Sequence, residues 1–323
     1  MTNVFRVKKP GLFTTVQDLG RTGYQQYGMV VSGAMDPFAL QIANILVGNP
    51  RNEAGLELTL MGPDLEVMDD SVIALCGADL SPMLDGKSVP VWKSFKVKKG
   101  ETLHFGRPNS GSRAYLAVAG GLDVPVVMGS KSTFIKGSIG GLDGRELHKQ
   151  DLLKKNDTGI NQTFQTGKSL HPSLIPEYHA YNRCRVIRGP DERAFEPKSF
   201  ETFFTGTYKV SRQADRMGYR LNGPALVHRD RADIISDAIL PGTVQVPANG
   251  EPIILLADRQ TTGGYARIGT VISVDLPYIG QMHAGQELMF EETTTEQAQA
   301  LYIKQEQMMK QLQTAAGRNR PTA

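Results

Sequence analysis

Short apolar stretches, most of them ended by glycine or proline, run along most of the chain. Residues 56–60 alternate between apolar and polar side chains until Gly62 and Pro63. Residues 71–76 form a largely apolar run that ends at Gly77. Further runs occupy residues 114–119, 185–188, 243–246, 253–257 and 270–274. Alternation with a period of two is typical of half-buried strands, and short apolar runs are typical of buried ones, so the pattern predicts a mainly β protein.

Two helices and one hairpin turn are expected among these strands. Asp36 and Pro37 suit the N-cap and first position of a helix that continues to residue 47 and ends at Gly48. Residues 84–87 contain an Asp-Gly pair, which favours a tight hairpin. Residues 296–312 have helical composition, and we expect residues 317–323 to be disordered.

A chain of 323 residues exceeds the usual size of one domain, so two domains are expected. The segment 156–183 is polar, has no apolar period and is predicted to be a linker. The predicted organisation is an N-terminal domain at 1–155, the linker at 156–183, a second domain at 184–295 and a helical or disordered tail at 296–323.

A weak internal repeat supports two related domains. The sequence Arg-Thr-Gly-Tyr at residues 21–24 is echoed by Arg-Met-Gly-Tyr at residues 216–219, and an aspartate precedes each. A Gly-Gly pair also occurs in each half, at residues 120–121 and 263–264. Matches this short arise by chance, but their common order favours two similar halves.

Composition argues against several classes of protein. The 36 Lys and Arg nearly balance the 33 Asp and Glu, for a net charge of +3, which gives no sign of nucleic-acid binding. Cys76 and Cys184 lie in apolar surroundings and are expected to be buried free thiols. The first ten residues lack the apolar core of a signal peptide, and no stretch approaches the ~18 apolar residues of a membrane span. A cytoplasmic protein without membrane contact is therefore expected.

Common ligand-binding motifs are incomplete. Gly86-Lys87-Ser88 and Gly167-Lys168-Ser169 end like a phosphate-binding loop, but the first glycine of that loop is missing in both. No dinucleotide-binding Gly-x-Gly-x-x-Gly is present, and the six histidines lack metal-ligand spacing, so no metal site is predicted. Lys310 follows Met309 but lacks the second methionine of a biotin-accepting Met-Lys-Met, so no biotin attachment is expected.

Five stretches are unusually rich in Gly, Asp, Arg, Gln and Thr. They are residues 14–24, 32–37, 120–133, 214–221, and 245–247 taken with 258–265. Turn chemistry alone explains much of any single stretch, and Asp-Arg pairs can be structural salt bridges. Five such loops in one chain favour a binding site.

These stretches offer groups suited to a small amide and a phosphate. Arg21, Arg216 and Arg220 carry planar guanidinium groups that match carboxylate or phosphate oxygens. Lys131 supplies a point charge. The Gly-Gly pair at 263–264 lets backbone N–H groups approach a ligand closely. Either Asp215 or Asp258 is a candidate to act as a base or to orient an arginine.

In this order, the motifs resemble the family that comprises the C subunit of 5-oxoprolinase, the KipA-type antagonists of a kinase inhibitor and the carboxyltransferase region of urea carboxylase. The matching stretches are TTVQDLGRTGY, SGAMDPFALQIANILVGN, ELTLMGPDLEV, GGLDVPVVMGSKST, DRMGYRL and QVPANGEPIILLADRQTTGGYARIGTVI. They extend from residue 11 to about residue 290. The resemblance implies two cyclophilin-like β-barrel domains with a few short helices.

The resemblance also implies an activity and partners. It implies the C subunit of an ATP-dependent 5-oxoprolinase, inactive alone, which cleaves 5-oxo-L-proline to L-glutamate with ATP hydrolysis. The implied partners are a KipI-like B-type subunit, with which the ATP site is shared, and a LamB/YcsF-like A-type subunit. Two alternatives stay open: a KipA-like regulator that antagonises an inhibitor of a histidine kinase, and one component of a biotin-dependent carboxyltransferase.

Site residues follow from the same motifs. The residues predicted to be catalytic are Asp215, Arg216 and Asp258. The residues predicted to bind substrate or nucleotide are Arg21, Ser32, Lys131, Arg220, Gln245, Gln260, Thr261, Gly263, Gly264 and Tyr265.

Overall fold

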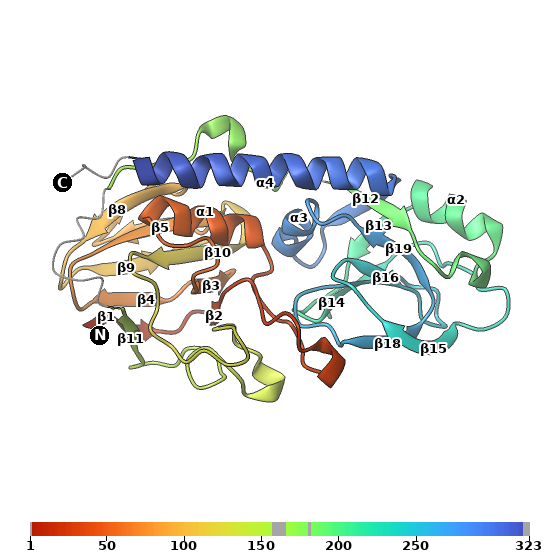
Figure 1. Cartoon of the computed structure of the whole chain (residues 1–323), viewed down its shortest axis with the longest axis horizontal. Coiled ribbons are helices and arrows are strands. Elements are labelled where there is room, and N and C mark those ends of the chain that lie inside the picture. The colour runs from red at the N-terminus through yellow and green to blue at the C-terminus, as the bar shows by residue number, and fades with distance from the viewer. Residues whose placement is uncertain (1, 157–165, 180–181, 319–323) are drawn as a thin grey trace. The chain divides into compact units, whose positions relative to one another are not determined.

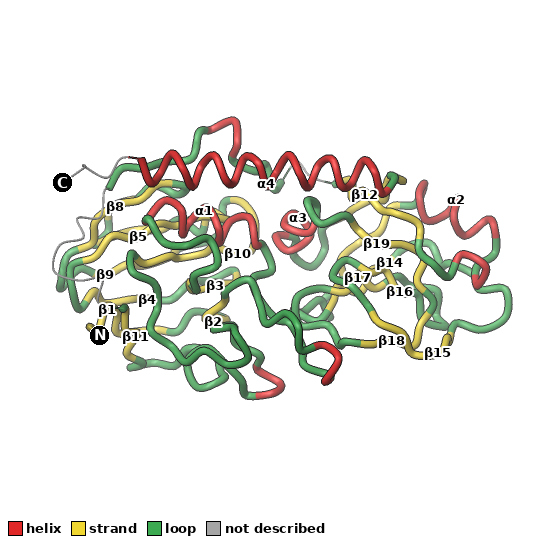
Figure 2. Tube along the Cα trace, in the orientation of Figure 1, coloured by secondary structure: helices red, strands yellow, loops and turns green. Residues whose placement is uncertain are grey.

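The computed structural model describes residues 2–156, 166–179 and 182–318 (Figure 1). The chain divides into two compact units. Unit 1 comprises Met1–Arg21, Ser32–Glu177 and Gln307–Ala323, and unit 2 comprises Thr22–Val31 and Tyr178–Glu306. Strands dominate both units, so the mainly β prediction is confirmed (Figure 2).

The strands of unit 1 form two sheets (Figure 1). The six-stranded sheet contains, in order, β11 (Leu152–Lys155), β1 (Thr2–Lys9), β4 (Asp64–Val67), β9 (Thr102–Phe105), β6 (Pro82–Leu84) and β7 (Lys87–Ser88). The five-stranded sheet contains β2 (Phe13–Gln17), β3 (Gly55–Thr59), β10 (Ser110–Val118), β5 (Ser71–Asp79) and β8 (Lys93–Val97). The predicted turn at Asp85 and Gly86 joins β6 to β7, and both residues have positive φ, as a tight hairpin requires.

The core of unit 1 joins the two sheets. Phe5, Leu65 and Leu103 from the first sheet belong to one buried cluster with Leu58 and Leu116 from the second. Each such side chain contributes roughly 1.5–3 kcal/mol when fully buried. The two sheets therefore pack face to face, with the apolar positions of each strand turned inward.

Helix α1 (Pro37–Val47) packs on β5 and β10 of the five-stranded sheet (Figure 1). As predicted, Asp36 caps it: the Asp36 carboxylate accepts a hydrogen bond from the Ala39 N–H at 2.9 Å. Gly48 ends the helix in the left-handed conformation, again as predicted. The short 3₁₀ segments of unit 1 are η2 (Ile135–Gly137) and η3 (Pro172–Leu174).

Strand β5 runs further than the sequence pattern indicates. It continues through Gly77 to Asp79, because Gly77 pairs with Ala114 of β10 and does not end the ladder. The register between the two strands shifts just beyond this pair, between Ser110 and Ala114. The glycine thus accompanies an irregularity inside a strand, which the apolar run alone cannot distinguish from a strand end.

Unit 2 contains a closed barrel of seven strands. In barrel order they are β12 (Arg183–Arg188), β19 (Arg267–Val271), β16 (Thr243–Gln245), β17 (Ile253–Leu255), β14 (Gly218–Asn222), β13 (Thr207–Val210) and β20 (Glu287–Glu292). Strands β15 (Asp233–Ala238) and β18 (Thr262–Tyr265) form a separate two-stranded ribbon. The remaining elements are η1 (Gln25–Tyr27), η4 (Glu192–Ala194), α2 (Pro197–Thr205) and α3 (Leu276–Gln281).

The barrel is filled by side chains that alternate with outward ones. Tyr208 and Tyr219, on the neighbouring strands β13 and β14, are almost fully buried. Helix α2 packs on β20, where the Phe203 and Phe290 rings are stacked with centroids 4.2 Å apart. The period of two seen in the sequence is thus the inward and outward alternation of a small barrel.

The C-terminal helix α4 (Thr295–Arg318) is longer than predicted. It extends past residue 312 and includes Gly317, which was expected to be disordered; residues 319–323 lie outside the described residues. Within the predicted linker, Lys168 donates a hydrogen bond to the Ala316 carbonyl at 2.7 Å, and Leu170 is buried. Among the described helices, none combines the length and apolar character needed to cross a bilayer.

The two cysteines are free and buried, as predicted. Cys76 lies on β5, where burial raises the pKa of its thiol well above the ordinary value. Both thiols therefore contribute as small apolar side chains.

Candidate functional site

Arg216 and Asp258 form a buried ion pair in unit 2. The Arg216 Nε donates to one carboxylate oxygen of Asp258 at 2.9 Å and Nη2 to the other at 3.2 Å. The Asp258 N–H also donates to the Arg216 carbonyl at 2.8 Å. The pair therefore ties the start of the loop 258–265 to the turn that precedes β14. With both oxygens of Asp258 held by guanidinium, the geometry favours orienting an arginine over accepting a proton.

Asp215 shapes the turn before β14. Its exposed carboxylate accepts hydrogen bonds from the N–H groups of Met217 at 2.8 Å and Gly218 at 3.1 Å. In unit 1, Asp18 accepts from the N–H of Gly20 in the same way, at 2.7 Å. The two aspartates of the sequence echo thus make the same local turn, in which an Asx side chain bonds to the backbone two residues on.

The loop 258–265, which includes β18, carries five of the ten predicted binding residues. Gln245 is buried and donates to the Tyr265 carbonyl at 3.2 Å. A Cβ atom at Gly263 would lie 2.4 Å from the Gln245 Nε2, so this position admits only glycine without movement of the glutamine. Gln260 is exposed and Tyr265 is 41% exposed.

The rest of this loop is held by backbone hydrogen bonds and by a buried arginine of the loop itself. The Thr261 carbonyl accepts a hydrogen bond from the Ile239 N–H at 3.2 Å, and Gly264 lies in β18. Arg259 is buried within the loop and donates to the Ile239 carbonyl at 3.3 Å, and burial lowers its pKa to about 10. Of the predicted binding side chains of this loop, Gln260 and Tyr265 are exposed and Thr261 is partly exposed.

Arg220 lies on β14 and points out of the barrel, in contrast to Arg216. It lines an open pocket of about 750 Å³ together with Lys209 and Arg212. Neither Lys209 nor Arg212 was among the predicted site residues. The alternation of β13 places Lys209 on the outer face, whereas Arg212 follows the strand in a turn, so only the structure shows that it lines the pocket.

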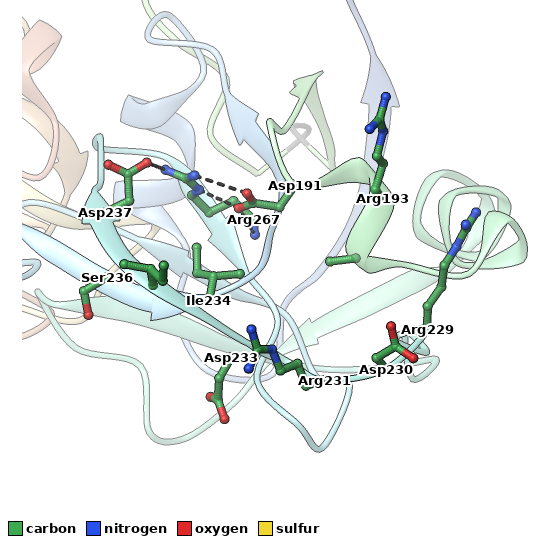
Figure 3. A pocket seen from close by; sticks show the side chains of 12 residues that line it. Asp191, Arg193, Arg229, Asp230, Arg231, Asp233, Ile234, Ser236, Asp237 and Arg267 are labelled. Carbon is green, nitrogen blue, oxygen red and sulfur yellow. Dashed lines mark hydrogen bonds and ion pairs between the residues drawn. The ribbon is translucent and has the colours of Figure 1, made fainter.

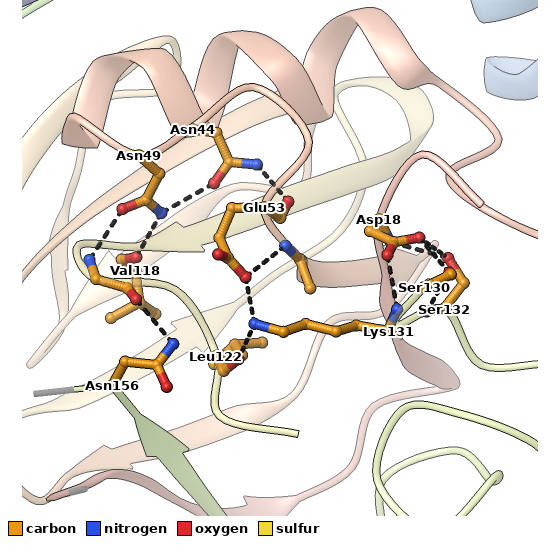
Figure 4. Close-up of polar contacts among 12 residues, drawn as sticks. Asp18, Asn44, Asn49, Glu53, Val118, Leu122, Ser130, Lys131, Ser132 and Asn156 are labelled. Atoms are coloured by element: carbon orange, nitrogen blue, oxygen red, sulfur yellow. Dashed lines mark hydrogen bonds and ion pairs between the residues drawn. The ribbon is translucent and has the colours of Figure 1, made fainter. Parts of the chain in front are cut away.

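Lys131 is paired within unit 1 (Figure 4). Its ammonium donates to the Glu53 carboxylate at 2.6 Å and to the Leu122 carbonyl at 2.8 Å. A Cβ atom at Gly121 would lie 2.4 Å from the Glu53 carboxyl carbon, so the glycine at this position leaves space for the acid. As the chain stands, the lysine charge is directed at a protein carboxylate.

Asp18 is the centre of the same network (Figure 4). Besides Gly20, its carboxylate accepts from the Lys131 N–H at 2.6 Å, from the Ser130 hydroxyl at 2.7 Å and from the Ser132 hydroxyl. Asp18 is 7% exposed. The residues of the Gly-Ser-Lys-Ser stretch are thus organised around one buried carboxylate.

Arg21 and Ser32 are also buried in unit 1. Arg21 is fully buried and donates to the Ser132 carbonyl through Nη2. Ser32 adopts a positive φ of 57° and is 5% exposed. Its hydroxyl has no hydrogen-bond partner among the described residues. A buried hydroxyl of this kind is costly, which keeps Ser32 as a candidate for contact with a ligand.

The stretch that follows Ser32 is anchored by two buried side chains. Glu57 accepts from the Met35 N–H at 2.9 Å, and the Tyr115 hydroxyl accepts from the Asp36 N–H at 2.7 Å. The Tyr115 hydroxyl also donates to Glu57 at 2.7 Å. Burial, and then the Glu57 charge, raise the pKa of Tyr115 well above its ordinary value, so the phenol keeps its proton.

A second pocket of about 660 Å³ in unit 2 was not predicted (Figure 3). At one side Arg267 donates to Asp191 at 2.7 Å and to Asp237 at 2.9 Å. Four arginines and four aspartates line this pocket, so its charges balance. In the sequence, the alternating Arg-Asp-Arg of residues 229–231 was the pattern that could have indicated this charged pocket.

The described residues thus separate the predicted site into groups. Arg216 and Asp258 contact each other, and Gln245 contacts the Gly263–Tyr265 loop. In unit 1, Arg21 meets the Ser130–Ser132 network that also contains Lys131. Within unit 2, Arg220 projects into a different pocket on the outer face of β14, with which Arg216 and Asp258 share no lining.

Comparison with known proteins identifies relatives over nearly the whole chain. The chain is 40% identical to the C subunit of 5-oxoprolinase from Escherichia coli over 313 residues, which are 96% of this chain and 97% of that protein. It is 35% identical to the corresponding 5-oxoprolinase protein of Haemophilus influenzae over 92% of this chain and 94% of that protein.

Larger enzymes contain a similar region. The crystal structure of Kluyveromyces lactis urea amidolyase matches with a TM-score of 0.87 and 30% identity, over 97% of this chain but only 20% of that chain. The family described as carboxyltransferase domain, subdomain A and B, matches residues 27–292. The chain therefore belongs to the carboxyltransferase domain, subdomain A and B, family.

Proposed function

We propose that this chain is the C subunit of an ATP-dependent 5-oxoprolinase. It acts with the A-type and B-type subunits to cleave 5-oxo-L-proline to L-glutamate with ATP hydrolysis, and is inactive alone. The observation that carries the proposal is the 40% identity to a 5-oxoprolinase C subunit, which extends over 97% of that protein. Such end-to-end similarity supports the same role for the whole polypeptide.

The larger relatives support the proposal less directly. The chain corresponds to 17% of the urea amidolyase of Saccharomyces cerevisiae, at 33% identity. A polypeptide equivalent to so small a part of a multidomain enzyme needs other components for a comparable reaction. We therefore propose a hetero-oligomer with a KipI-like B-type subunit, a LamB/YcsF-like A-type subunit, and no biotin on this chain.

The reaction requires two kinds of recognition. Water opens the lactam ring by adding to the amide carbonyl, and the ring nitrogen becomes the amine of glutamate. ATP hydrolysis activates that carbonyl, so the site must hold both a small carboxylate-bearing amide and phosphate groups. Guanidinium groups suit both anions, and backbone N–H groups suit the carbonyl oxygen as negative charge develops on it.

Within this proposal, Arg216 and Asp258 act as positioning residues for the loop 258–265. Their bidentate pair holds the start of the loop, while Gln245 packs against Gly263. Gln260 and Tyr265 then contact substrate, and ATP occupies a site shared with the B-type subunit. Replacement of Arg216 by an uncharged residue would leave Asp258 buried without its partner and shift the loop 258–265. We therefore expect slower cleavage of 5-oxo-L-proline.

Reconstitution tests the proposal. The purified A-, B- and C-type proteins are mixed with 5-oxo-L-proline and ATP, and glutamate and ADP are measured. We expect both products in the complete mixture and neither above background when this chain is omitted. The variants Gln260→Ala and Tyr265→Phe should reduce turnover, and Lys304→Gln, at an exposed position of α4, serves as the control that should not.

The regulatory alternative predicts a different result. A KipA-like antagonist would bind its B-type partner, yet glutamate formation would not depend on it. Glutamate formed at the same rate without this chain, with B-type binding intact, would reject the 5-oxoprolinase proposal and favour the regulator.

A further inference from the structure

The outer face of the hairpin formed by β13 and β14 carries a group of cations. We call this site the basic pocket and define it by its charged and polar lining residues: Lys209, Ser211, Arg212, Gln213, Arg220, Asn222, Asn249 and Glu251. It has a volume of about 750 Å³ and is open to solvent. Its position on one barrel wall means that it lies within unit 2 alone.

Strand register explains why these side chains share one face. Lys209 pairs with Asn222, and the Ser211 N–H donates to the Arg220 carbonyl at 2.9 Å, one step further along the hairpin. The intervening residues Val210 and Leu221 pair with each other and are buried in the barrel. Side chains two residues apart lie on the same face of a strand, so Lys209, Ser211, Arg220 and Asn222 point outward together. Arg212 follows β13 in a turn and joins them in the lining of the pocket.

The charges of the basic pocket are not balanced. Its lining includes three cations, Lys209, Arg212 and Arg220, and a single carboxylate, Glu251. Glu251 accepts a hydrogen bond from the Asn249 amide at 3.0 Å, and Lys209 lies 3.4 Å from Glu287. By contrast, the side chains of Arg212 and Arg220 make no hydrogen bond or ion pair with any described residue.

Two guanidinium groups that line one pocket and have no ion-pair partner among the described residues are suited to an anion from outside. Each can donate two parallel hydrogen bonds to phosphate oxygens, and the pair repels itself until such an anion binds. The hydroxyl of Ser211 and the amides of Asn222 and Asn249 add neutral donors. The volume lies within the range of ~300–1,000 Å³ that is usual for small-molecule sites.

We propose that the basic pocket binds an oligophosphate, with Arg212 and Arg220 as its main ligands. The described lining includes no aromatic side chain on which a nucleobase could stack, so recognition is directed at the phosphates. If the proposed function holds, the natural ligand would be the phosphate chain of ATP, and only this identification rests on the proposed function. Oligophosphate binding by the isolated chain is independent of it.

Calorimetry with the full-length chain and sodium triphosphate tests the inference. We expect wild-type protein to bind triphosphate, and Arg212→Gln/Arg220→Gln to bind it at least about tenfold more weakly because two charge-assisted contacts are lost. Arg231→Gln is the matched control. Arg231 is also an exposed arginine of unit 2, but it lies in the charge-balanced pocket, so its loss should leave affinity unchanged.

Further binding measurements test whether the pocket recognises the phosphate groups or another part of ATP. ATP and triphosphate should bind with similar affinity and compete, since the pocket recognises phosphates. The double variant Arg212→Lys/Arg220→Lys keeps both charges but loses the paired N–H donors of guanidinium, and should bind triphosphate with intermediate affinity. Added salt should weaken wild-type binding more than binding by the double Gln variant.

Three results would overturn the inference. They are no triphosphate binding by the wild-type chain, equal binding by the double Gln variant, or ATP binding that triphosphate does not displace. None of these results bears on whether the chain is required for glutamate formation, so failure here and failure of the proposed function are distinguishable. Thermal unfolding of each variant confirms that the exposed substitutions leave the fold intact.

Discussion

The network around Asp18 in unit 1 and the basic pocket in unit 2 use similar residue types in opposite ways. In the first, the Lys131 ammonium meets the Glu53 carboxylate at 2.6 Å, and Asp18 accepts hydrogen bonds from its neighbours (Figure 4). In the second, the Arg212 and Arg220 guanidinium groups form no hydrogen bond or ion pair with a carboxylate of the described residues. Charges of the first kind hold loops together, whereas charges of the second kind are free to meet a ligand.

This contrast changes how the motif-rich loops are understood. The stretch at residues 129–133 resembles the end of a phosphate-binding loop, yet its lysine is directed at a protein acid. The DRMGYRL stretch contains both kinds of arginine: Arg216 is paired and buried, and Arg220, four residues later, is exposed. Residue type alone therefore does not separate a structural charge from a binding charge; its partner does.

The largest expected effect comes from removing a buried partner. Arg216→Ala leaves the Asp258 carboxylate buried without its guanidinium, and should lower the free energy of unfolding by about 3–5 kcal/mol. Urea denaturation measures the loss. The double variant Arg216→Met/Asp258→Leu removes both charges and should lose less than Arg216→Ala. A loss below about 1 kcal/mol for the single variant would mean that the pair is solvated.

An intermediate effect is expected at Asp18. Asp18→Ala removes an acceptor from Gly20, Ser130, Lys131 and Ser132. Because these donors are left buried or partly buried without an acceptor, we expect a loss of about 2–4 kcal/mol in urea denaturation.

Asp18→Asn is the matched control for this prediction. It can retain the Oδ1 acceptor used by Gly20, Ser130 and Ser132, while its amide faces the Lys131 N–H. It should therefore lose less stability than Asp18→Ala. Equal losses for the two variants would indicate that the charge, and not the set of accepted hydrogen bonds, stabilises the network.

The smallest effect on stability is expected in the basic pocket. Arg212→Gln and Arg220→Gln remove exposed charges without a protein partner, so each should change the free energy of unfolding by no more than about 0.5 kcal/mol. A slight gain is compatible with relief of repulsion between them. A loss comparable to that of Asp18→Ala would show that these arginines are structural and would remove the contrast between the two regions.

Local features of the fold could be predicted from the sequence. Asp36, Pro37 and Gly48 define the ends of α1 through cap chemistry that depends only on neighbouring residues. The Asp-Gly pair at residues 85–86 forms the hairpin between β6 and β7 for the same reason. Such features follow from local backbone preferences, which a single sequence contains in full.

Features that depend on distant partners could not be predicted. Lys131 and Glu53 are 78 residues apart, and Arg216 and Asp258 are 42 apart, so their pairing follows from strand order. Arg212 was missed because no motif surrounds it; it lies in the turn after β13 and meets Arg220 only in the lining of the basic pocket. The clustering of Gly, Asp, Arg, Gln and Thr identified the polar loops. The tertiary structure shows which of their charged side chains are paired with other protein groups.

Titration of this chain into fixed amounts of the A- and B-type proteins, with 5-oxo-L-proline and ATP, tests the central claim most directly. We expect glutamate formation to rise from background with added chain and to reach a plateau when the other components are saturated, with ADP formed in parallel. Two results would contradict the proposed role. One is glutamate formation that is already maximal without this chain. The other is glutamate formation that stays at background at every amount of it, while the same A- and B-type proteins are active with the C-type protein of Escherichia coli.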